Sequence, residues 1–79
     1  MAMRFLNANR PPVVAVRDAV AAAFSDTWLF QHGQETREAA ACSCALARDL
    51  LARAYIDDVE LRDRLETFVT ECEAVLRPG

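Results

Sequence analysis

The chain has 79 residues, of which 53% are hydrophobic and 27% charged, with only two glycines. This composition argues against disorder and favours helices, and the length suits one domain (1–79) around one small core. The formal net charge is −3, so the chain lacks the basic footprint of a nucleic-acid-binding protein.

The charge is unevenly distributed along the chain. Residues 55–79 contain seven acidic residues against three arginines, which gives this segment a formal charge of −4. Such a surface suits a basic protein partner rather than a phosphate backbone. No apolar run is long enough to span a bilayer, and the N-terminus lacks a signal-peptide pattern, so we expect a cytoplasmic protein without membrane contact.

Residues 1–9 are expected to form an N-terminal arm, and the first helix is expected over residues 11–25. A proline in the first turn of a helix is harmless, because the missing N–H has no intrahelical partner there. Apolar residues then recur at spacings of three and four, which is typical of a helix with one buried face. The expected buried stripe is Val13, Val16, Val20, Ala23 and Phe24.

The segment after this helix contains three consecutive large apolar residues, Trp28, Leu29 and Phe30. Ser25 and Asp26 interrupt the helical pattern, so residues 26–32 are a candidate short helical turn that ends at Gly33. One helical turn cannot bury three consecutive side chains on one side. Either the turn plugs one end of the bundle, or an aromatic residue stays exposed as a contact for a partner.

The longest helix is expected over residues 35–56. Its predicted apolar stripe mixes small residues with leucines, which would let a neighbouring helix approach closely. The polar exception is Ser43, which lacks a nearby base in the sequence and is therefore interpreted as structural. The stripe consists of Ala39, Ser43, Leu46, Ala47, Leu50, Leu51 and Ala54.

A third helix is expected over residues 58–77. Asp57 and Glu60 have the spacing of a capping box, and Ile56 and Leu61 have that of a hydrophobic staple. The predicted buried stripe is Leu61, Leu65, Phe68, Cys72 and Val75, with Val69 and Leu76 beside it. Short connections between consecutive helices favour antiparallel neighbours. The predicted fold is therefore an all-α, antiparallel bundle of three main helices.

The sequence contains no convincing catalytic or metal-binding pattern. Cys42 and Cys44 lie two residues apart on a predicted helix, so their side chains point about 200° apart and cannot reach one ion or form a local disulfide. Cys72 fits a core position, and His32 fits a contact with a helix C-terminus. We therefore expect no enzyme activity, no metal and no cofactor.

The expected function is a non-catalytic protein–protein interaction. The sharpest hypothesis is a small inhibitor of phage or mobile-element origin, acting in the host cell cytoplasm. It would block a larger bacterial complex that handles nucleic acid, such as a CRISPR effector, by occupying a basic surface without binding nucleic acid itself. The candidate partner-binding residues are Trp28, Phe30, Asp58, Glu66, Glu71 and Glu73.

Two other hypotheses remain open. The chain could be a self-associating structural or regulatory subunit, because a short chain that is 53% hydrophobic can have apolar surface left over for a homodimer. Alternatively, Cys42, Cys44, Cys72 and His32 could form a thiol or metal site after folding.

Overall fold

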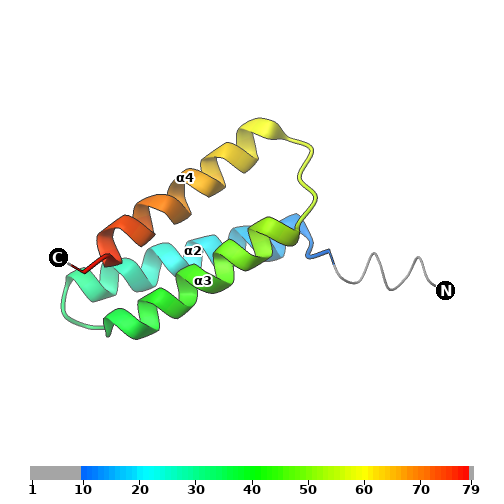
Figure 1. The fold of residues 1–79 in the computed structure, drawn as a ribbon. Coiled ribbons are helices and arrows are strands. Elements are labelled where there is room, and N and C mark those ends of the chain that lie inside the picture. The colour runs from blue at the N-terminus through cyan, green and yellow to red at the C-terminus, as the bar shows by residue number, and fades with distance from the viewer. Residues whose placement is uncertain (1–9, 79) are drawn as a thin grey trace.

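The structure is a computed structural model that describes residues 10–78. These residues form three helices and no strand: α2 (Val13–Gln31), α3 (Arg37–Arg53) and α4 (Val59–Leu76). Each helix packs against the other two. Figure 1 shows α3 running back along α2, and α4 then returning in the direction of α2. The predicted all-α three-helix bundle is confirmed, while the predicted arm at 1–9 lies outside the described residues.

The prediction of a helix over 11–25 followed by a separate turn at 26–32 is wrong, because α2 continues without a break to Gln31. Of the two residues expected to interrupt it, Asp26 bonds to α3, and so does its neighbour Thr27. The Ser43 hydroxyl donates to the Asp26 carboxylate, and Thr27 is buried with its Oγ1 3.8 Å from Cys44 Sγ. Since these side chains have partners on α3, they do not compete for the backbone of α2.

The predicted end of this segment at Gly33 is confirmed. The N–H of Gln34 donates to the carbonyl of Leu29 at 2.8 Å, and the N–H of Gly33 donates to that of Phe30 at 3.1 Å. This is the bonding pattern of a Schellman motif. Gly33 has φ of 73°, a left-handed conformation that residues with a Cβ rarely adopt.

The helix predicted over 35–56 begins and ends inside those bounds. Thr36 caps α3, and its side chain accepts a hydrogen bond from the N–H of Ala39 at 3.1 Å. The helix ends at Arg53, because Ala54 adopts an extended conformation with ψ of 148°. The extended connection places Ile56 in the core.

The third helix also differs slightly from its predicted bounds of 58–77. The capping-box prediction is wrong by one residue, because Asp58 and not Asp57 is the N-cap of α4. The Asp58 carboxylate accepts from the N–H of Leu61 at 3.1 Å, so Leu61 and not Glu60 is the third residue of the helix. The extended link carries Ile56 into the core and leaves Asp58 as the last residue before the helix.

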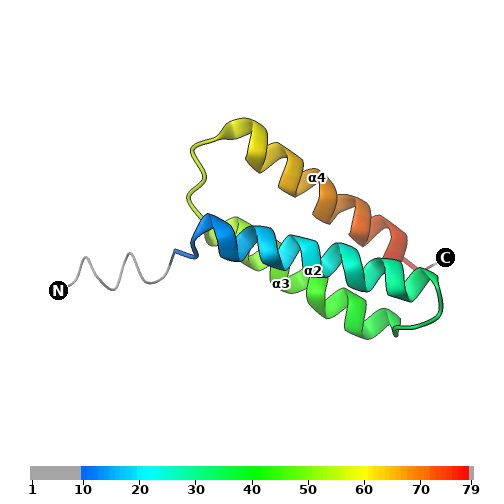
Figure 2. The same cartoon turned by 180° about the vertical axis from the view of Figure 1, so that it is seen from behind.

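The core lies along the line where the three helices meet. Its buried residues from α2 and α3 are mostly alanine and valine, so these two helices lie close together, as Figures 1 and 2 show. The buried apolar residues are Val16, Ala19, Val20, Ala23, Ala40, Cys44, Ala47, Leu51, Ile56, Leu65, Val69, Cys72 and Leu76. No helix among residues 10–78 is long and apolar enough to cross a membrane.

The buried stripe of each helix is rotated from the predicted one. Four residues assigned to the core are exposed: Phe24, Leu46, Phe68 and Val75. Each helix in a three-helix bundle has two neighbours, and these cover only part of a wide apolar arc. With residues 26–31 incorporated in α2, residues 10–78 contain no fourth helix that covers the remaining part. Three of the four exposed residues consequently lie on one side of the molecule, between α2 and α4.

A candidate protein-interaction surface between α2 and α4

Three aromatic side chains lie together and exposed where α2 meets α4. Phe24 and Trp28 come from α2 and are 55% and 48% exposed, and Phe68 comes from α4 and is 45% exposed. Together with Val75 they line two adjoining depressions that share Phe24 and Phe68, which we call the aromatic groove. A group of large aromatic side chains that stays exposed on the surface is typical of a protein-interaction site.

The groove has two parts that meet at the Phe24–Phe68 pair. The part near the start of both helices is an open hollow of about 470 Å³. Its walls are apolar, and its only charged residues are arginines; besides the two phenylalanines it is lined by Arg17, Val20, Ala21, Leu61, Arg64 and Leu65. The smaller part, further along, has a volume of about 110 Å³ and is lined by Trp28 and Val75 with Thr27, Gln31, Glu71 and Cys72.

Trp28 is held in place from one side by His32. The two rings stack with their centroids 3.7 Å apart and an interplanar angle of 20°. In addition, Nδ1–H of His32 donates to the carbonyl oxygen of Trp28, with 2.9 Å between the heavy atoms. A restrained tryptophan loses less side-chain entropy on binding, so it is a more effective contact residue than a freely rotating one.

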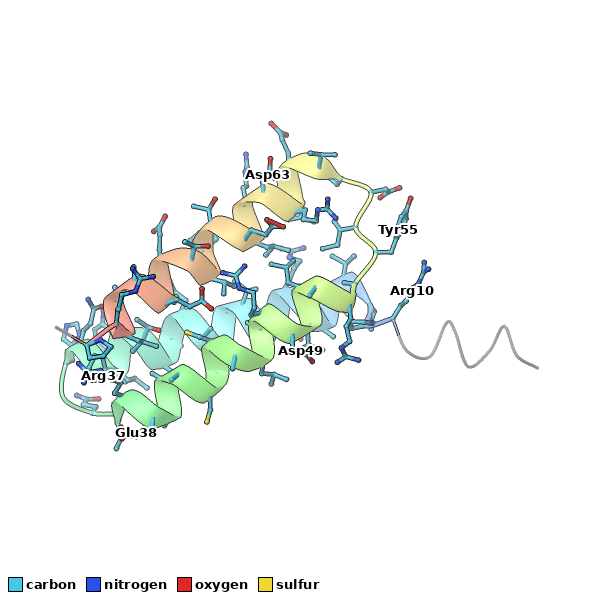
Figure 3. The ribbon with its side chains drawn as sticks, viewed as in Figure 1. Arg10, Arg37, Glu38, Asp49, Tyr55 and Asp63 are labelled. Carbon is cyan, nitrogen blue, oxygen red and sulfur yellow. The ribbon has the colours of Figure 1, made fainter. Side chains whose placement is uncertain are left out.

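Acidic side chains border the groove on the outer face of α4. Asp63, Glu66 and Glu71 line a shallow depression there with two threonines, and we call these three residues the acidic ridge. None of them takes part in an ion pair within residues 10–78. Asp63 is labelled on α4 in Figure 3. The ridge meets the groove at Glu71, which lines both.

The other predicted contact residues have partners within the chain. Phe30 is half-buried against the core, with the Arg37 guanidinium 5.1 Å from its ring centroid. Asp58 caps α4. Of the six candidates, the structure therefore brings Trp28 and Glu71 together in the groove, while Glu66 lies in the ridge beside Glu71.

Glu73, the remaining candidate, faces α3 instead of a free surface. Its carboxylate accepts from Arg48 at 2.7 Å, and the same guanidinium donates to Thr70 at 3.1 Å. The bond from Glu73 is also the main reason why the pKa of Arg48 is raised. This pair joins α3 to α4 and accounts for the position of Glu73 without any partner.

The three cysteines do not assemble into one site. Cys42 is exposed, whereas Cys44 and Cys72 are buried, and all three are free thiols. Burial is the main cause that raises the pKa of the Cys44 thiol, which makes it a weaker nucleophile and metal ligand at neutral pH. No group of three or more histidine, cysteine or acidic residues within residues 10–78 is placed to hold a metal ion.

Sequence reasoning missed Phe24 and Phe68 as surface residues, because both continue a regular apolar pattern and were assigned to the core. The missed signal is the width of the stripes. The predicted stripe of the third helix extends from Phe68 and Val75 on one side to Val69 and Leu76 on the other. Two neighbouring helices cannot cover such a width, so one edge must be exposed or bound.

No protein-family model, curated protein or solved structure matches this chain.

Proposed function

We propose that this chain is a non-catalytic interaction protein whose contact surface is the aromatic groove. The observation that carries the proposal is the exposure of Phe24, Trp28 and Phe68 side by side. Burying these three side chains against a partner would remove a large apolar area from water, and aromatic residues in the centre of an interface carry much of its binding energy. The polar residues around the groove correspond to the rim of such an interface.

Within this class, we propose the inhibitor of phage or mobile-element origin as the specific function. It would act in the host cytoplasm on a larger bacterial complex that handles nucleic acid. The support is the charge of the acidic ridge beside the groove, since unpaired carboxylates complement a basic surface and repel nucleic acid. An inhibitor of this kind needs a contact surface but no catalytic group.

The experiment is affinity capture from a host-cell lysate with tagged wild-type chain and two variants. Trp28→Ala shortens a groove residue, and Leu46→Ala shortens an apolar residue of similar exposure, 55%, on α3. We expect Trp28→Ala to reduce the retained protein by about tenfold or more, as at an interface hot spot, and Leu46→Ala to leave it unchanged. Equal capture by all three chains would refute the groove as the contact surface.

The inhibitor proposal has its own readout. The double change Asp63→Arg and Glu66→Arg reverses two charges of the acidic ridge. If a basic partner binds there, this variant should lose capture at low salt, and the remaining capture should become insensitive to salt. Circular dichroism must show unchanged helicity. Capture that keeps the wild-type affinity and salt dependence would rule out a basic partner at the ridge.

A further inference from the structure

The two ends of the aromatic groove carry opposite charges. Arg17 and Arg64 line the hollow near the start of α2 and α4. Gln31 and Glu71 line the part near the ends of the same helices. Because α2 and α4 run in the same direction (Figures 1 and 2), an occupant that matches the groove must present an acidic group at one end and a basic group at the other.

The spacing of these residues about the aromatic pair is nearly symmetrical. On α4, Arg64 precedes Phe68 by four residues and Glu71 follows it by three, which is about 6 Å and 4.5 Å along the helix. On α2, the small Ala21 precedes Phe24 by three residues and the large Trp28 follows it by four. The groove thus has a positive charge and a small residue on one side of its centre, and a negative charge and a large residue on the other.

We propose that the occupant of the aromatic groove is a second copy of this chain, packed face to face in an antiparallel, two-fold arrangement. This inference rests on the proposed function, in which the groove is the contact surface of the chain. A two-fold axis that passes near Phe24 and Phe68 places Arg64 of each copy opposite Glu71 of the other. It also places Trp28 opposite Ala21, where a large side chain meets a small one.

Arg64 and Glu71 cannot satisfy each other within one chain. They are seven residues apart on a helix, which is about 10.5 Å along its axis. Neither takes part in an ion pair within residues 10–78. A second copy offers a glutamate to Arg64 and an arginine to Glu71 at the same time. The two-fold symmetry alone makes these charges complementary, so no unrelated partner is needed.

The size of the face is adequate for a dimer. Helices of this length are about 27 Å long and about 10 Å wide, so α2 and α4 side by side present about 540 Å² in projection. The accessible area of a ridged helical face is larger than its projection, and a standard interface buries roughly 800 Å² per partner. Asp63 and Glu66 lie on the outer face of α4 and remain free, so the dimer presents two acidic ridges to a basic partner. Loss of the dimer in Trp28→Ala would therefore also weaken capture of that partner.

The first test is the mass of the untagged chain by sedimentation equilibrium from low micromolar concentration to about 1 mM. We expect a monomer–dimer equilibrium, accompanied by a blue shift of the emission of the single tryptophan as Trp28 becomes buried. Trp28→Ala should shift the equilibrium towards monomer by about tenfold or more, whereas Leu46→Ala should not.

The second test uses charge reversal in trans. Arg64→Glu gives a chain with two acidic residues at the paired positions, and Glu71→Arg gives a chain with two basic ones. Each variant alone should dimerise about tenfold more weakly than wild type, and an equimolar mixture should recover a heterodimer, which native mass spectrometry would detect. Glu66→Arg changes a charge outside the contact and serves as the control.

The outcomes separate the two proposals. A chain that stays monomeric to about 1 mM while capture from a lysate still depends on Trp28 would overturn the second copy and leave the groove as a contact surface. A dimer that neither Trp28→Ala nor the charge reversals weaken would overturn the groove as the site of self-association. A mixture of the reversed chains that fails to form heterodimers, when each alone is weakened, would overturn the antiparallel arrangement.

Discussion

The rings of Phe24 and Phe68 meet edge to face, with their centroids 6.1 Å apart and an interplanar angle of 87°. This contact is the only aromatic pair that joins two helices among residues 10–78, and roughly half of each side chain remains exposed. It ties α2 to α4 while leaving about half of its apolar area at the surface. The pair is therefore the centre of the groove and a part of the packing at the same time.

Phe68 should contribute less to stability than its smaller neighbour Val69, which is completely buried. Val69→Ala leaves a cavity in the core, and we expect it to lower the free energy of unfolding by about 2 kcal/mol or more. Phe68→Ala should cost about 1 kcal/mol, because much of the ring is already in water. Urea denaturation at a concentration where the chain is monomeric measures both. A larger loss for Phe68→Ala would place this ring in the core.

The N-cap of α4 provides a test of the corrected helix boundary. Asp58→Ala removes the carboxylate that accepts from the N–H of Leu61, and we expect a loss of about 1 kcal/mol in the free energy of unfolding. Asp57→Ala changes an exposed neighbour with the same charge and should cost much less. Equal losses, measured by thermal or urea unfolding, would contradict Asp58 as the cap.

The Arg48–Glu73 pair should couple α3 to α4 only weakly. The side chains of Arg48 and Glu73 are 40% and 39% exposed. Water therefore screens the ion pair, although its N–O distance is short. A double-mutant cycle with Arg48→Ala and Glu73→Ala should give a coupling energy of about 0.5–1 kcal/mol that decreases in high salt. A coupling energy of zero at low salt would show that the contact is only incidental.

The buried Cys44 thiol should make the stability of the fold sensitive to alkaline pH. Burial raises its pKa above the ordinary value of 9.0, so the folded chain keeps this proton when the unfolded chain has lost it. The stabilisation is complete below about pH 9 and is lost as the pH rises towards the pKa of the folded state. Unfolding free energies measured from pH 7 to pH 10.5 should decline above about pH 9.

The control for this prediction is Cys44→Ala, which removes the titrating group and lowers stability at every pH. Its stability should decline less steeply above about pH 9 than that of the wild type. Identical slopes for wild type and Cys44→Ala would contradict the role of Cys44.

Much of the architecture could be predicted from local signals in the sequence. Gly33 ends α2 because a left-handed residue favours glycine, and the acidic pair at 57–58 marks the start of α4 because a carboxylate can accept from free N–H groups. The apolar periodicity likewise indicates three helices. All of these signals act between residues that are only a few positions apart in the sequence. The choice between Asp57 and Asp58 was missed, because it depends on where Ile56 enters the core.

The candidate surface depended on the packing of the whole chain. The sequence determined that each helix has an apolar arc, and it singled out Trp28 and Glu71 as candidate contact residues. Only the tertiary structure decided which edge of each arc is covered, because coverage depends on the neighbours and crossing geometry of a helix rather than on its own periodicity. Phe24 and Phe68 became surface residues for that reason. Asp26 does not break α2, because Ser43 of α3 supplies a hydroxyl that donates to its carboxylate.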